Sequence, residues 1–143
     1  MKLKKQIQPA ALALAELELF RTCDDEQLAL LLPHADIVDV PAGDVLDRAG
    51  RPARQFIGIL DGYVQRIDAD GRSTVMGRGQ HFGASELMQR ADHDANYVAV
   101  TASRLLVVFG PAFRAAIREI PAVADKAIDE IALVPSHELS AVA

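Results

Sequence analysis

The fold of this chain is decided by the stretch FIGILDGYV at residues 56–64. An apolar run, an Asp-Gly turn and a second apolar run are typical of a strand, a tight turn and another strand. Similar short runs rich in Val and Ile recur at residues 37–40, 74–76, 97–100 and 105–109, separated by Gly-containing turns. Many short strands at this spacing predict an antiparallel sandwich or barrel over residues 35–110.

Helical patterns flank the predicted barrel on both sides. Residues 1–34 carry apolar positions at helical spacing, with Pro9 at a helix start and Asp24 or Asp25 able to cap a second helix. After the barrel, Pro111 and Pro121 each open a helix within residues 111–134. Residues 135–143 are expected to form a tail, so the interpretation is one domain over residues 1–143.

Composition limits the function classes open to the chain. Its 143 residues carry a net charge of −5, which argues against nucleic acid as a partner. No apolar stretch approaches the length of a membrane span, so membrane insertion is not expected. Cys23 is the only cysteine, which excludes an intrachain disulfide and favours a reducing, cytoplasmic location.

Five segments together resemble one known family, the cyclic-nucleotide-binding domains of the catabolite activator and protein kinase A regulatory-subunit type. They are LELFRTCDDEQL (17–28), PAGDVL (41–46), FIGILDGYV (56–64), GQHFG (79–83) and AVTASRLLVV (99–108). The resemblance runs from about Leu17 to Ile120. It implies a mainly β fold, a double-stranded β-helix jelly-roll barrel flanked by N-terminal and C-terminal helices.

The segment at residues 82–95 resembles the family's phosphate-binding cassette but differs in the side chains that hold the ligand. The resemblance implies a Glu for the ribose, an Arg for the phosphate and then a Ser or Thr; this chain has Ala84, His93 and Asp94 there. Removing one partner of a buried charge pair costs about 2–5 kcal/mol. Spacing from Gly83 to Ala95 is intact, so the prediction is a kept scaffold with weak or no cAMP or cGMP binding and no cofactor.

A second hypothesis keeps the pocket in use as a small-molecule sensor for cAMP, cGMP or a less anionic ligand. Its contacts would come from the segment's remaining groups, with the smaller Ala84 enlarging the pocket. The candidate ligand-binding residues are Gly83, Ala84, Ser85, Glu86, His93, Asp94 and Ala95. Under this hypothesis Glu86 reaches a ribose, Arg90 and Arg78 are the nearest guanidinium groups, and protonated His93 meets a phosphate at low pH.

No enzyme is predicted. Cupin enzymes share the jelly roll but need a His-x-His pair, which this chain lacks, so no metal site is expected. No Gly-x-Ser-x-Gly or Cys/His arrangement for nucleophilic catalysis is present.

The favoured function is therefore a non-enzymatic regulatory or protein-interaction module. Its partner would be another protein or a second copy of the chain, met through the C-terminal helices, because the resemblance implies that those helices move or dimerise. The candidate contact residues are Val123, Ala127, Ile128 and Ile131, whereas Phe113 and Ile117 are expected in the core. Nothing basic follows Pro135, so DNA binding through a following helix-turn-helix is not expected.

Overall fold

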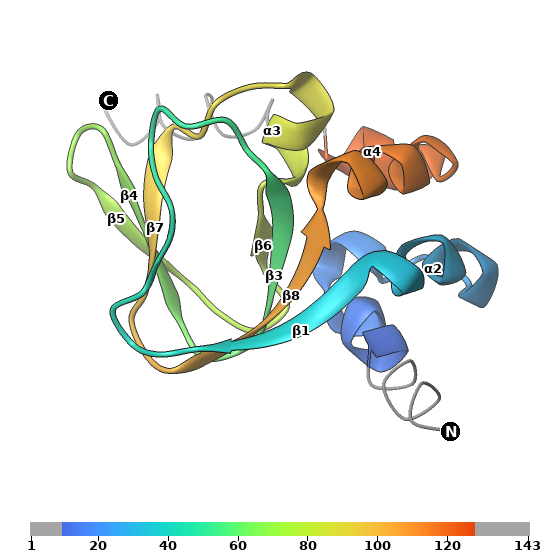
Figure 1. Cartoon of the computed structure of the whole chain (residues 1–143), viewed down its shortest axis with the longest axis horizontal. Coiled ribbons are helices and arrows are strands. Elements are labelled where there is room, and N and C mark those ends of the chain that lie inside the picture. The colour runs from blue at the N-terminus through green and yellow to red at the C-terminus, as the bar shows by residue number, and fades with distance from the viewer. Residues whose placement is uncertain (1–9, 128–143) are drawn as a thin grey trace.

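In a computed structural model, which describes residues 10–127, eight strands form two four-stranded antiparallel sheets that enclose a barrel (Figure 1). One sheet has the order β1-β8-β3-β6 and the other β2-β7-β4-β5. The strands are β1 (Ala35–Val40), β2 (Val45–Asp47), β3 (Gln55–Asp61), β4 (Val64–Asp68), β5 (Ser73–Met76), β6 (His81–Phe82), β7 (Ala95–Ala99) and β8 (Ser103–Phe109). This mainly β jelly roll with flanking helices confirms the predicted fold class.

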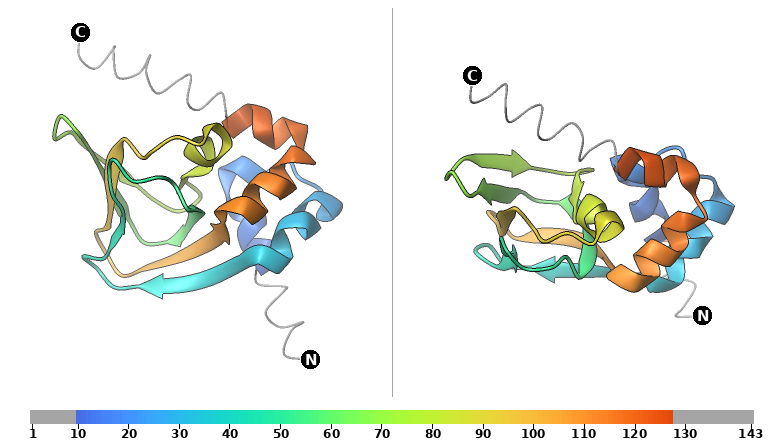
Figure 2. Two further views of the ribbon diagram at one scale, coloured as in Figure 1. Left: turned by 45° about the horizontal axis from the view of Figure 1, so that its top comes forward. Right: turned by 90° about the horizontal axis from the view of Figure 1, so that it is seen from above.

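The helices gather at one side of the barrel (Figure 2). Before β1 come helical residues 10–16, η1 (Glu18–Phe20), α2 (Asp25–Leu31) and η2 (Leu32–His34); after β8 come α4 (Gly110–Arg118) and helical residues 121–127. One further helix, α3 (Ala84–Gln89), is inserted between β6 and β7. Within residues 10–127, no helix combines the length and the apolar character that crossing a bilayer requires.

Local signals in the sequence explain where these helices begin. The Asp24 side chain accepts a hydrogen bond from the Gln27 amide at 2.8 Å, and the Gln27 side chain accepts one from the Asp24 amide at 2.9 Å. This capping box satisfies two donors that a helix start leaves unpaired and confirms Asp24 as the cap of α2. Helix α4 begins at Gly110, one residue before the predicted start at Pro111.

One aromatic stack joins the helices to the barrel wall. The Phe56 ring on β3 stacks on Phe113 of α4, with ring centroids 4.8 Å apart, and meets Phe20 of η1 edge-on at 5.4 Å. All three rings are fully buried. Phe113 and Ile117 are both 0% exposed, which confirms their expected place in the core.

The same core corrects part of the expected partner surface. Val123 and Ala127 are 0% exposed and pack with Phe113 and Ile117, so neither side chain is presented to a partner. Proline at position 121 starts a helix whose apolar face covers the domain itself. Ile128 and Ile131 lie outside the described residues.

Candidate functional site

The turn that starts α3 depends on a glycine. Gly83 has φ = +93°, a left-handed conformation that favours glycine, and a Cβ there would lie 2.6 Å from the backbone oxygen of Gln55. The β6 strand therefore runs directly against β3 before the chain turns into α3. The short helix α3 follows Phe82-Gly83 directly.

Helix α3 is anchored to the barrel and to α4 by its apolar side. Ala84 and Leu87 are each 1% exposed and belong to the core that contains Phe56 and Phe113. A Cβ placed on Gly110, the first residue of α4, would lie 2.8 Å from Leu87 Cδ2. Leu87 thus packs directly over the start of α4, so α3 and α4 contact each other through this side chain.

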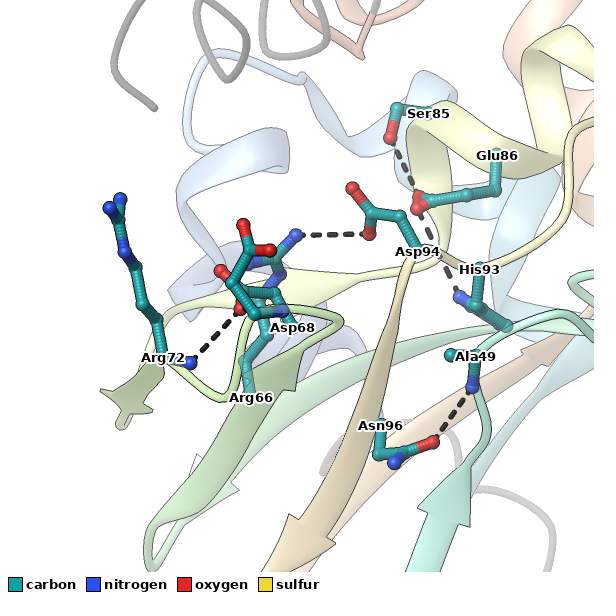
Figure 3. A network of polar contacts seen from close by, with 10 residues as sticks. Ala49, Arg66, Asp68, Arg72, Ser85, Glu86, His93, Asp94 and Asn96 are labelled. Carbon is teal, nitrogen blue, oxygen red and sulfur yellow. Dashed lines mark hydrogen bonds and ion pairs between the residues drawn. The ribbon is translucent and has the colours of Figure 1, made fainter. Parts of the chain in front are cut away.

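The polar side of α3 faces a buried histidine. The His93 side chain is 0% exposed, and its Nε2 lies 3.1 Å from Asp47 Oδ2. Its Nδ1 lies 4.0 Å from Glu86 Oε2 (Figure 3). The Ser85 hydroxyl donates to Glu86 Oε1 at 2.7 Å, which orients that carboxylate. His93 is therefore flanked by carboxylates from two elements, β2 and α3.

Backbone hydrogen bonds fix the position of His93 as firmly as its side-chain contacts do. Its amide donates to the Arg51 carbonyl at 2.9 Å, and its carbonyl accepts from the Gly50 amide at 2.8 Å. The loop after β2 is thereby tied to the loop before β7. This pairing carries Asp47 and His93 into the same buried space, although they are far apart in sequence.

Electrostatics favour the protonated form of His93. Burial by itself lowers the pKa of the imidazole, but Asp47, Glu86 and Asp94 together outweigh burial, and the pKa of His93 is raised above its ordinary value. Neither imidazole nitrogen makes a well-aligned hydrogen bond, and neither does Asp47 Oδ2. We therefore treat the 3.1 Å contact as mainly electrostatic.

A second charge pair lies beside His93. Arg66 on β4 contacts Asp94 with Nη2 and Oδ1 2.9 Å apart (Figure 3). Arg66 also interacts with the side chain of Tyr97. Tyr97 stacks on Phe82, with ring centroids 4.0 Å apart, and meets the His93 ring edge-on at 5.6 Å. Burial and the nearby negative charge of Glu86 raise the pKa of Tyr97 to about 12, although Arg66 acts in the opposite direction. The phenol is therefore neutral at physiological pH.

The structure brings only some of the expected site residues together. Glu86, His93 and Asp94 share one polar cluster, while Ala84 and Ala95 are buried in apolar surroundings. Arg90 is exposed. Arg78 forms an ion pair with Glu16, with Nη2 and Oε1 3.2 Å apart. Within residues 10–127, no group of three or more His, Cys, Asp or Glu side chains is placed to hold a metal ion.

Three members of the cluster were missed from the sequence: Asp47, Arg66 and Tyr97. Arg66 and Tyr97 are directly paired across β4 and β7, so a correct strand alignment would have placed them side by side. Asp47 is the last residue of the short strand β2 and carried no signal, since its partner His93 approaches from a loop.

With this geometry established, comparison with known proteins assigns the chain to a family. The model of the cyclic nucleotide-binding domain matches residues 37–119, more than half of the chain. The chain belongs to the cyclic nucleotide-binding domain family. Its match covers both sheets, α3 and the start of the C-terminal helices, which confirms the resemblance seen in the sequence.

A curated relative also matches most of the chain. A Rhodopseudomonas palustris protein, provisionally named a potassium channel protein, is 30% identical over 115 residues; the match covers 78% of this chain but only 28% of that protein.

Solved structures agree on the fold. The sensor domain of the transcriptional regulator DNR from Pseudomonas aeruginosa is 20% identical, with a TM-score of 0.73, and the match covers 94% of this chain and 93% of that one. The regulatory subunit of a cAMP-independent protein kinase A from Trypanosoma brucei is 19% identical, with a TM-score of 0.81, over 96% of this chain and half (50%) of that one.

Proposed function

We propose that this cyclic nucleotide-binding domain is a non-enzymatic regulatory module that binds cAMP and cGMP weakly or not at all. The observation that carries the proposal is the contact of buried His93 with Asp47 at 3.1 Å. In the family resemblance, position 93 holds the arginine that pairs with the cyclic phosphate. Here the imidazole at that position is already committed to carboxylates of the domain itself.

The charges around His93 also oppose an anionic ligand. The carboxylates of Asp47, Glu86 and Asp94 lie near His93. The neighbouring guanidinium group of Arg66 is already paired with Asp94. A cyclic phosphate would have to displace Asp94 from Arg66 and remain close to the other two carboxylates. Because Asp94 is 60% exposed, displacing it from Arg66 costs only about 0.2–1 kcal/mol, so the main obstacle to an anionic ligand is the negative charge of Asp47 and Glu86.

The ribose contact is also missing. Position 84, where the resemblance implies a glutamate, holds an alanine that is 1% exposed within the apolar core. The idea that Ala84 enlarges a ligand pocket therefore finds no support, because its methyl group packs against the core. A protein kinase A regulatory subunit of the same fold is described as cAMP-independent, which supports the view that this fold can work without the nucleotide.

The partner is proposed to be another protein or a second copy of the chain. The relative from Rhodopseudomonas palustris is several times longer than the matched region, which supports a domain that acts on something else. Contact through the C-terminal helices remains part of the proposal for Ile128 and Ile131, as does a cytoplasmic location.

The test is a titration of the full chain with cAMP and with cGMP, followed by backbone amide chemical shifts. We expect no saturable shift in residues 83–95 at micromolar ligand. Saturation in that range would overturn the proposal. The double variant His93→Arg/Asp94→Ser restores a cation and frees Arg66, so it should gain affinity, whereas the control Asp92→Ser, an exposed neighbour, should not.

One observation favours the alternative, a sensor that binds through non-standard contacts. The Arg66 side chain is 19% exposed and the Asp94 carboxylate that it pairs with is 60% exposed, so a ligand anion could compete with Asp94 for Arg66 from the solvent side. If micromolar binding is found, Arg66→Met should abolish it under this alternative. Binding that survives Arg66→Met would exclude this route.

A further inference from the structure

His93 connects three elements that are otherwise separate at this end of the barrel. Its ring precedes β7, and its Nε2 faces Asp47 on β2. Its Nδ1 faces Glu86 on α3 (Figure 3). The two nitrogens are not equally engaged: the gap to Asp47 is 3.1 Å, and the gap to Glu86 is 4.0 Å. The second distance is too long for a hydrogen bond, which requires about 2.7–3.2 Å.

The protonation state of the ring decides whether that second gap can close. A neutral imidazole has one N–H, so it can donate to only one of the two flanking carboxylates and turns a lone pair toward the other. Protonation supplies the second N–H and a positive charge. The Glu86 carboxylate, already oriented by Ser85, then gains a charge-assisted donor only a short movement away.

Glu86 is linked to α4 through the helix that carries it. Glu86 and Leu87 are neighbours on the six-residue helix α3, and Leu87 packs over Gly110 at the start of α4. Leu87 is 1% exposed, so it has no free space into which it can move independently. A shift of α3 toward His93 therefore changes how α4 is seated.

We propose that His93 is a proton-binding site whose occupancy sets the position of α3 and, through Leu87, of α4. This inference rests on the proposed function, because it gives the cassette a proton as its regulatory ligand in place of a nucleotide. The proton comes from bulk water and forms one N–H bond on the imidazole, and no other bond changes.

The side chains that face the ring are mainly acidic, which favours a cation there. Asp47 faces it from β2, Glu86 from α3, and Asp94 and Tyr97 from the start of β7, while Arg66 of β4 is turned to Asp94 and Tyr97. The three carboxylates raise the pKa of His93 against the effect of burial, as described above. The pKa of His93 is thereby raised above its ordinary value.

The experiment is a pH titration of the full chain by NMR, from about pH 5.5 to pH 8.5, which brackets the usual range of histidine. Imidazole shifts of His93 and amide shifts of α3 and α4 are followed in the same samples. We expect all three to change with one midpoint. Amides of α4 that do not follow the His93 midpoint would overturn the proposal.

Two variants separate coupling from a general pH effect. Glu86→Gln keeps the side-chain shape but removes the charge that the protonated ring attracts, so His93 should still titrate while the α4 shifts largely disappear. Persistence of the full α4 response in Glu86→Gln would also overturn the proposal. His34→Gln, at an exposed residue of η2, is the matched control and should leave the α4 response unchanged.

The same samples distinguish this inference from the proposed function. Adding cAMP at both ends of the pH range tests nucleotide binding without reference to the α4 titration. If cAMP causes no chemical-shift changes and the α4 amides do not respond to pH, the proton-site proposal is contradicted and the proposed function is not. Micromolar cAMP binding would remove the proposed function, and with it the proton as the replacing ligand.

Discussion

The imidazole Nε2 of His93 lies 3.1 Å from Oδ2 of Asp47, and the histidine side chain is completely buried. Forty-six positions along the chain separate these residues, and the backbone pairing of the loops at Gly50 and Arg51 with His93 brings them together. A family position that the resemblance assigns to an external phosphate is here satisfied by an internal carboxylate. Under the proposed function, the carboxylate of Asp47 therefore takes the place of a ligand phosphate beside His93.

Replacing His93 by glutamine should destabilise the domain in a pH-dependent way. The pKa of His93 is raised in the folded state, so its stabilising contribution is fully present below the unfolded value of about 6.5 and is lost as pH rises through the folded pKa. We expect His93→Gln to lower the free energy of unfolding by about 1–3 kcal/mol near pH 6 and by less near pH 8. Urea unfolding of both proteins at each pH measures the difference.

The exposed His34 supplies the control for that experiment, because His34→Gln removes a histidine without removing a buried contact. Its free energy of unfolding should match that of the wild type at each pH. A penalty for His93→Gln that stays constant or grows with pH would contradict the assigned charge pair.

Two glycines with the same φ angle should respond differently to replacement by alanine. Gly43 and Gly83 both have φ = +93°, but a Cβ on Gly43 meets nothing within 4 Å, whereas one on Gly83 meets the Gln55 carbonyl oxygen at 2.6 Å. Gly43→Ala should cost about 1–2 kcal/mol from conformational strain alone. Gly83→Ala adds the clash and should cost roughly 2–5 kcal/mol. Equal penalties in urea unfolding would show that α3 is not seated against β3 as described.

Most of the fold was predictable because local signals and tertiary structure agree. Apolar runs near β3, β4, β5, β7 and β8 matched strands, and Asp24 and Pro111 lie at or next to helix starts. The strands β2 and β6 were not predicted as separate runs, since they have three and two residues and depend on pairing with distant strands. Short elements of this kind are specified by their partners rather than by their own residues.

The site was predictable in position but not in its contacts. The bounds of residues 82–95 can be read from the sequence, because spacing is a property of one continuous segment. Burial of Ala84 and the pairing of His93 with Asp47 depend on how separate elements pack, which no periodicity reports. The same reason explains Val123 and Ala127, whose apolar helical pattern fits an internal face and an external face equally well.

The contact of Leu17 with Gly58 should appear as a strong energetic coupling. A Cβ on Gly58 would meet Leu17 Cδ1 and Cδ2 well inside contact distance, and Leu17 is 0% exposed. Gly58→Ala alone should cost about 1–3 kcal/mol through overpacking, and Leu17→Ala alone about 2–5 kcal/mol through the cavity it leaves. In the double variant the added methyl occupies space that Leu17 vacated.

The double-mutant cycle for Leu17 and Gly58 therefore predicts non-additivity. The double variant should be about 1–3 kcal/mol more stable than the sum of the single penalties implies. Urea unfolding of the four proteins gives the coupling energy. Additive penalties would mean that the N-terminal helices do not rest on β3 through this pair.

Tyr97 should resist ionisation until the solution is strongly alkaline. Burial raises its pKa to about 12, so little tyrosinate should form while the domain stays folded below about pH 11.

The chain has two tyrosines, and Tyr63→Phe, at an exposed position, leaves Tyr97 as the only phenol whose ultraviolet absorbance changes. In that background, Glu86→Gln should lower the pKa of Tyr97 and Arg66→Met should raise it, because the two charges act in opposite directions. Near-ultraviolet circular dichroism, recorded in parallel, reports whether the fold is intact. Tyrosinate that appears near pH 10 in a folded domain would contradict the burial of Tyr97 against Phe82 and His93.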